Sequence, residues 1–152
     1  MGPDTGEPAP DAGGRALRQR RRLALRGVRG PVARGREFAR EALDDWGWGA
    51  NATAEDALLV VSELVTNASL HAGGCHELLV GAGDVLRIEV YDGLTDLPRL
   101  LPAPRPGIPG GYGLHIVRRL ADRWGAEAHE HGKVVWAEIG VERLRIGAPR
   151  EP

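Results

Sequence analysis

The sequence has little cysteine, little lysine and no long apolar run. Cys75 is the only cysteine of the 152 residues, which excludes a disulfide within the chain and any zinc or iron–sulfur site built from several cysteines. No stretch approaches the roughly 18–20 apolar residues of a membrane span. Met1 to Arg22 also lacks the apolar segment of a signal peptide. We therefore expect a soluble, cytoplasmic protein.

The charges balance overall but not along the chain. The formal net charge is −1, yet residues 15–40 hold ten arginines, and Lys133 is the only lysine among 20 basic residues. Exposed arginines can bind the phosphates of a nucleic acid. Clustered arginines without interleaved aromatic residues are more often a solvated face or tail, so a nucleic-acid contact is the weaker interpretation of this stretch.

Length and composition predict one ordered domain between two tails. A chain of this size buries enough surface to form a core without a disulfide or a metal, and 42% hydrophobic with 27% charged residues is typical of a globular protein. Residues 1–14 contain mainly Gly, Pro, Ala and acids, which predicts a disordered tail. The domain is expected over 15–141, and a flexible C-terminal tail over 142–152.

The apolar periodicity predicts three helices and five strands. The helices are expected over residues 31–43, from Thr53 to 71, and over 113–124. Thr53 and Asp56 have the spacing of a capping box. The strands are expected over 23–28, 77–80, 85–91, 126–130 and 134–139, with a hairpin turn over 81–84. Helices and strands are grouped and do not alternate, so the fold class is α+β, a mostly antiparallel sheet covered on one face by about three helices.

The second predicted helix carries a carboxylate and an amide at a spacing that suits a binding site. Glu63 and Asn67 are four residues apart and share a face. Leu59 and Leu70 flank them. A carboxylate among apolar neighbours is poorly solvated unless a ligand, a hydroxyl nucleophile or a metal shell comes to it. The alternative is a pair of surface residues without a role.

Two later segments have features of a ligand site. Asp92 and Gly93 end a predicted strand, where an Asp can accept from an exocyclic amine or simply form a turn. A Pro- and Gly-rich connection follows to Gly111 and is long enough for a lid or a binding loop. It leads through Gly110, Gly111 and Gly113 into the third helix. A glycine-rich segment at the start of a helix can bind an anion through its free N–H groups. The alternative is that this segment is an ordinary loop before a helix.

Taken together, these segments resemble the GHKL ATPase superfamily, which includes gyrase and histidine kinases, and most of all the small actinobacterial relatives of the anti-sigma-factor serine kinases. Glu63 to Ala68 resembles the N box, Asp92 the acid of the G1 box, and Gly111 to Leu114 the G2 box. Residues 132–138 resemble the closing strand. The resemblance covers roughly residues 23–139 and implies a two-layer, Bergerat-type sandwich.

The resemblance also implies ATP and Mg²⁺ as ligands, with a role for each motif. Asn67 would help to hold Mg²⁺, and Glu63 would be the general base. Asp92 would accept from the adenine amino group. The phosphates would be received by Gly111, Gly113 and the helix start at Leu114. One departure is clear, because the G1 box commonly reads Asp-x-Gly-x-Gly and here residues 92–96 read Asp-Gly-Leu-Thr-Asp.

At the level of function, the resemblance implies a serine/threonine protein kinase of the anti-sigma-factor type. Such a protein phosphorylates a small antagonist protein and sequesters a sigma factor or a similar regulator, and dimers are common among these kinases. The altered G1 box supports an alternative, a catalytically inactive nucleotide-binding module that acts through protein interactions. No membrane partner is expected.

Overall fold

A computed structural model of the chain describes residues 17–70, 74–93, 113–129 and 132–146. The strands are β1 (Leu17–Ala24), β2 (Cys75–Gly83), β3 (Val85–Asp92), β4 (Arg123–His129) and β5 (Gly132–Gly140). The helices are α1 (Pro31–Asp45), α2 (Ala52–Ser69), α3 (Gly113–Leu120) and α4 (Val141–Ile146). The predicted tail over 1–14 and the predicted loop after Gly93 lie outside the described residues.

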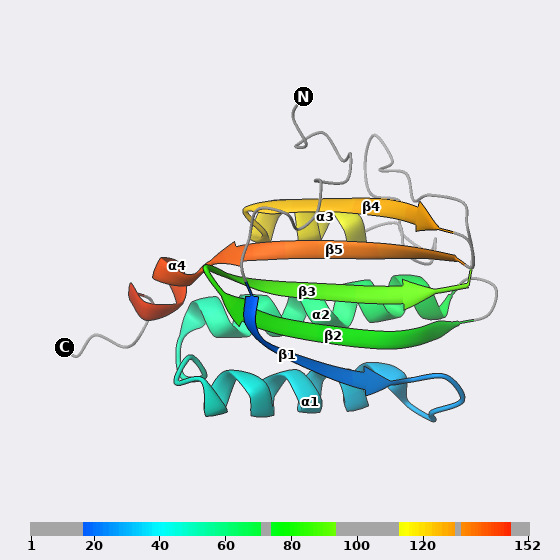
Figure 1. Ribbon diagram of the computed structural model, residues 1–152, viewed down its shortest axis with the longest axis horizontal. Coiled ribbons are helices and arrows are strands. Elements are labelled where there is room, and N and C mark those ends of the chain that lie inside the picture. Colours follow the sequence, from blue (N-terminus) through cyan, green and yellow to red (C-terminus); the bar gives the residue numbers. More distant parts are fainter. Residues whose placement is uncertain (1–16, 71–73, 94–112, 130–131, 147–152) are drawn as a thin grey trace.

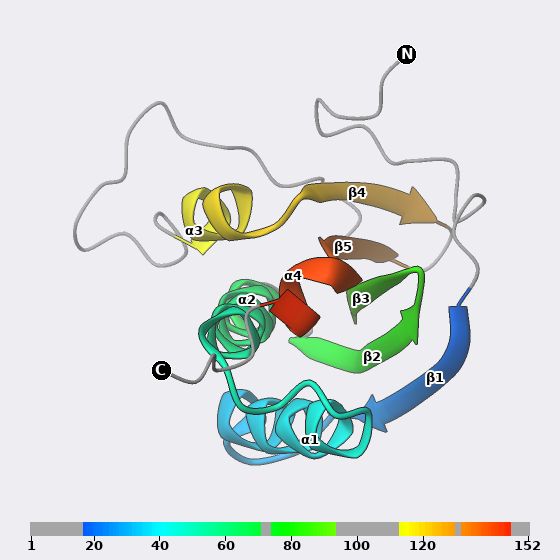
Figure 2. The same ribbon diagram turned by 90° about the vertical axis from the view of Figure 1, so that its left-hand side faces the viewer.

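The strands form one five-stranded sheet in the order β1-β2-β3-β5-β4, and every neighbouring pair is antiparallel (Figure 1). Helices α1, α2 and α3 lie along one face of this sheet, with α2 between the other two (Figure 2). The short helix α4 lies at one end of the strands. The architecture is therefore the predicted α+β fold with helices on one face of an antiparallel sheet.

The core lies between the helical layer and the sheet. On β3, Leu86, Ile88 and Val90 point into it, and α2 contributes an almost continuous buried face that includes Val61 and Leu64. Each such side chain stabilises the fold by about 1.5–3 kcal/mol when it is fully buried. This packing fixes α2 over the centre of the sheet, where it contacts β3 and β5.

The start of α2 differs from the capping box that the sequence predicts. Asn51 is the N-cap, and its side-chain oxygen accepts a hydrogen bond from the Ala54 N–H at 2.8 Å. Thr53 and Asp56 lie inside the first turns of the helix. The amide of Asn51 also donates to the Leu144 carbonyl at 3.0 Å. A cap that satisfies the helix and a distant carbonyl is favoured over one that satisfies the helix alone.

The first strand lies earlier in the chain than predicted, at residues 17–24 and not 23–28. Its side chains at Arg18, Arg20 and Arg22 are exposed, so it has no apolar pattern that the sequence could reveal. Because β1 is an edge strand that pairs only with β2 among the described strands, its outward positions can be charged.

Other boundaries also move. The β2 strand continues to Gly83, so the hairpin turn centres on Asp84 alone. The predicted helix over 113–124 ends at Leu120, because the Asp122 N–H donates to the Glu138 carbonyl of β5 and begins strand pairing. Arg123 and Trp124 therefore belong to β4.

The predicted C-terminal tail is wrong over its first residues. Residues 142–146 belong to α4, and Leu144 is buried in the core. Burial of the Leu144 side chain in the core stabilises this short helix. The charged residues on either side of Leu144 hide this role in the sequence. Residues 147–152 lie outside the described part of the chain. None of the described helices is long and apolar enough to cross a membrane.

Candidate functional site

Helix α2 places Glu63 and Asn67 one turn apart on the same face of the helix. Asn67 is 6% exposed and Glu63 is partly buried, while the flanking Leu59 and Leu70 are the large apolar side chains most exposed in the described part of the chain. The C-terminal end of α2 and the C-terminal end of β3 lie at the same end of the molecule, opposite α4 (Figure 1). The predicted spacing therefore brings both polar side chains toward the end of the sheet that carries Asp92.

The polar side chains of this pair have no partner in the described part of the chain. Within the described residues, Glu63 forms no ion pair or hydrogen bond, and the same holds for the side-chain amide of Asn67. Burial raises the pKa of Glu63 above its usual value. The amide of Asn67 is not among the fully enclosed polar groups that lack a partner in the described residues, so both it and the Glu63 carboxylate are accessible to a ligand.

Asp92 is held differently. It is 3% exposed at the end of β3, on the side of the sheet that faces the helices, directly opposite Lys133 of β5 in the strand register. The ammonium of Lys133, itself 1% exposed, donates to both carboxylate oxygens, at 3.1 Å and 2.8 Å. Asp92 is thus the last residue of the strand and lies in a buried ion pair, and the residues after Gly93, where a turn would continue, lie outside the described part of the chain.

The backbone around this pair is tightly packed. A Cβ on Gly132 would overlap the carbonyl oxygen of Asp92, so only glycine allows β5 to approach β3 this closely. On the other side of Asp92, Cys75 is its register partner on β2. Burial raises the pKa of the Cys75 thiol to about 11, so this cysteine is protonated and unreactive at neutral pH.

The start of α3 provides the remaining predicted feature. Gly113 is the first residue of the helix, and the side chain of Leu114 is buried. Helix α3 packs against α2. The N–H groups in the first turn of a helix have no partner within the helix and can bind a phosphate. Gly111, which the sequence also predicts as a phosphate ligand, lies outside the described residues.

Sequence reasoning missed Lys133 as a site residue. In the sequence, the Gly132-Lys133 pair belongs to the segment that resembles a closing strand. The signal that could have found it is the alternation of each strand, which puts Asp92 and Lys133 on the same face as their buried neighbours Val90 and Val135. The register that makes them opposite each other comes only from the structure.

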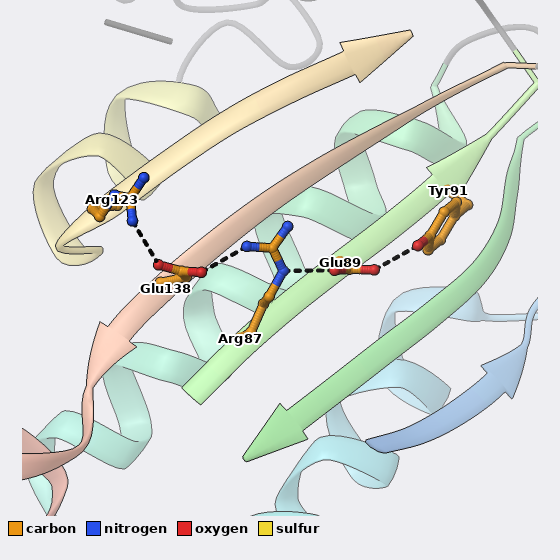
Figure 3. Close-up of polar contacts among 5 residues, drawn as sticks. All are labelled: Arg87, Glu89, Tyr91, Arg123 and Glu138. Atoms are coloured by element: carbon orange, nitrogen blue, oxygen red, sulfur yellow. Dashed lines mark hydrogen bonds and ion pairs between the residues drawn. The ribbon is translucent and has the colours of Figure 1, made fainter. Parts of the chain in front are cut away.

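A second group of polar residues was also missed, on the sheet face opposite the helices (Figure 3). We call it the outer-face cluster. It consists of five side chains: Arg87, Glu89, Tyr91, Arg123 and Glu138. Arg87 donates to Glu89 and to Glu138, both at 2.6 Å, while Arg123 lies 3.4 Å from Glu138. Tyr91 donates to Glu89.

Trp136 lies under this cluster and is fully buried. The guanidinium carbons of Arg87 and Arg123 are 4.5 Å and 5.6 Å from the centre of its ring, which is cation–π geometry. Burial lowers the pKa of Arg87, but its hydrogen bonds and charge interactions with Glu89 and Glu138 outweigh burial and raise it overall. Arg87 therefore keeps its charge, and the cluster cross-links β3, β5 and β4 on the outer face of the sheet.

The donor set at the candidate site fits a nucleotide with a hard cation. Mg²⁺ prefers oxygen ligands and usually keeps waters and phosphate oxygens with one or two protein ligands. The Asn67 amide oxygen could supply such a ligand. Among the described residues, no group of three or more His, Cys, Asp or Glu side chains is placed to hold a metal ion by itself. A cation at Asn67 would therefore depend on the phosphates of a bound nucleotide.

Comparison with known proteins agrees with this geometry. The family description "Histidine kinase-like ATPase domain" matches residues 30–139, from the residue before α1 almost to the end of β5. No match is found among curated proteins. The matched span contains α2, the Asp92–Lys133 pair and the start of α3, and membership of such a family fits ATP binding. Because the match covers most of the chain, the protein belongs to the histidine kinase-like ATPase family of GHKL type.

Proposed function

We propose that this protein binds ATP with Mg²⁺ and is a serine/threonine protein kinase of the anti-sigma-factor type. It would phosphorylate a small antagonist protein and sequester a sigma factor or a similar regulator. The observation that carries the proposal is the unsatisfied pair on α2. Asn67 is 6% exposed and Glu63 is partly buried, and neither has a partner among the described residues, which suits groups that bind a ligand.

Each site residue has a role that suits its environment. Glu63 has no cation beside it in the described residues and burial raises its pKa, so it is a stronger base than an ordinary carboxylate. Asn67 would offer its amide oxygen to Mg²⁺. Asp92 would accept from the adenine amino group, and the phosphates would lie at Gly113, Leu114 and Gly111.

The reaction then needs little covalent chemistry from the protein. Glu63 would take the proton of a partner's serine or threonine hydroxyl as that oxygen bonds to the γ-phosphorus. The bond from this phosphorus to the β–γ bridging oxygen breaks, and ADP leaves. Bound Mg²⁺ would neutralise the developing phosphate charge. Positioning and charge neutralisation supply most of the rate in such transfers.

Phosphate transfer from labelled ATP to candidate antagonist domains tests the proposal. Glu63→Gln should lower the transfer rate by roughly 100-fold or more, the usual contribution of a general base, and should leave ATP binding nearly intact. The matched control is Glu55→Gln on the same helix, because Glu55 is exposed and its one ion pair within the described residues is with Arg40, at 3.3 Å. Equal transfer by the Glu63→Gln variant and the wild type would contradict the role of Glu63.

The alternative function is a nucleotide-binding module without kinase activity. The departure of residues 93–96 from the usual G1 glycines favours it. Calorimetry separates the two functions. Tight ATP binding without transfer to any candidate would support the module, and no ATP binding would exclude both. A pulldown from native extract with and without ATP identifies the partner in either case, and sedimentation shows whether the chain forms a homodimer.

A further inference from the structure

The only lysine of the chain lies in the protein interior, beside the carboxylate that would recognise the base. Lys133 is 1% exposed, and its ammonium is within hydrogen-bond distance of both oxygens of Asp92. Apolar residues can often replace a buried ion pair without loss of stability. A buried ion pair is therefore weak evidence for a purely stabilising role, and a role in recognition accounts for the lysine better.

The chemistry of the pair is complementary to one edge of adenine. An ionised Asp only accepts hydrogen bonds and a Lys only donates them. Adenine presents the N6 amino group, a donor, next to N1, an acceptor. Asp92 and Lys133 present an acceptor and a donor from adjacent strands, with their charged atoms 2.8 Å apart at the closest.

We propose that Lys133 is a second base-reading residue, which donates a hydrogen bond to adenine N1 while Asp92 accepts from N6. The proposal rests on the proposed function, because it assumes that the base lies at Asp92. It extends that function by naming the residues that would make the site specific for adenine. Lys133 has a three-donor ammonium, so it can point one donor to the base and keep another on Asp92.

The Asp92–Lys133 pair would also discriminate against guanine at two positions of the base. Guanine carries an acceptor, O6, where adenine has its amino group, and a donor, N1–H, where adenine has an acceptor. In the adenine pose, O6 would face the Asp92 carboxylate and N1–H would face the Lys133 ammonium. A site whose charged groups meet the wrong partner discriminates strongly. Asp92 alone would supply only the first of these mismatches.

Nucleotide analogues test this without changing the protein. Calorimetry of the full chain with Mg²⁺ compares ATP with 1-deaza-ATP, in which N1 is replaced by C–H, and with 3-deaza-ATP as a control for ring substitution elsewhere. We expect 1-deaza-ATP to bind roughly 10- to 100-fold more weakly than ATP, the range for a hydrogen bond to a charged group. The 3-deaza analogue should bind about as ATP does.

Equal binding of ATP and 1-deaza-ATP would overturn the role of Lys133 and leave ATP binding intact. Absence of ATP binding would instead overturn the proposed function together with this inference, so the two failures are distinguishable. In Lys133→Met, checked for folding by circular dichroism, the preference for ATP over 1-deaza-ATP should disappear. A variant that binds ATP and keeps the preference would also refute the proposal, and if the variant does not fold, the wild-type comparison decides alone.

Discussion

Replacing Glu138 with glutamine removes one charge from the outer-face cluster without changing the size of the side chain. In the wild type, Arg87 and Arg123 are balanced by Glu89 and Glu138, and the side chains of Arg87 and Glu138 are 7% and 2% exposed. The substitution leaves two cations with one carboxylate in a region with little access to water. The unpaired charge should destabilise the fold.

The magnitude follows from burial. Breaking a fully buried pair costs about 3–5 kcal/mol, because one charge is left without its partner. Arg87 keeps its hydrogen bond to Glu89, and Arg123 is 29% exposed and can be solvated. We therefore expect the lower end, about 3 kcal/mol. For a chain of this size that corresponds to a fall in Tm of roughly 6–12 °C.

Urea unfolding at neutral pH measures this loss, and Glu127→Gln is the matched control. Glu127 is on β4, is exposed, and has no ion pair within the described residues. The control should stay within about 0.5 kcal/mol of the wild type. The loss at Glu138 should persist in 1 M salt, where the Debye length is about 3 Å, because a buried pair is weakly screened. A loss no larger than that of the control would refute the reasoning.

Three further predictions concern the candidate site. Glu63→Gln should raise Tm at pH 7, because the raised pKa of Glu63 means that ionisation opposes folding. The gain should shrink as the pH falls through this raised pKa and should be nearly gone below the ordinary value of 4.5, since the carboxyl is then protonated in both states; a lower Tm at pH 7 would contradict this. Cys75 should react with a thiol reagent far more slowly in the native state than in denaturant, and rapid native labelling would oppose this interpretation. Gly132→Ala should destabilise by at least about 1–3 kcal/mol through its clash with Asp92, and unchanged urea unfolding would show that the backbone can shift.

Features that depend on short-range pattern were predictable from the sequence. The helix over 52–69 shows its apolar face as a period within one segment, and Pro31 marks the first turn of α1. Glu63 and Asn67 share a face because the helix itself places residues four apart together. No information about the rest of the fold is needed for these statements.

Features that depend on which segments meet were not predictable. Asn51 is favoured as a cap because it also reaches Leu144, which is distant in the sequence. The strand β1 carries exposed arginines because it lies at the sheet edge, and its edge position is a property of the whole sheet. Likewise, Asp92 and Lys133 form a pair only because β3 and β5 adopt one register among several that their apolar alternation allows.

The two carboxylates of the candidate site therefore differ in a way that the sequence alone does not show. Asp92 has an ammonium on both oxygens, so its negative charge is already matched and it can act only as a fixed acceptor. Glu63 has no matching charge in the described residues, and burial makes its proton harder to lose. Two carboxylates whose surroundings differ in this way suit different roles in a site. The paired acid suits recognition of a base, and the unpaired acid suits a group that must gain and lose a proton during turnover.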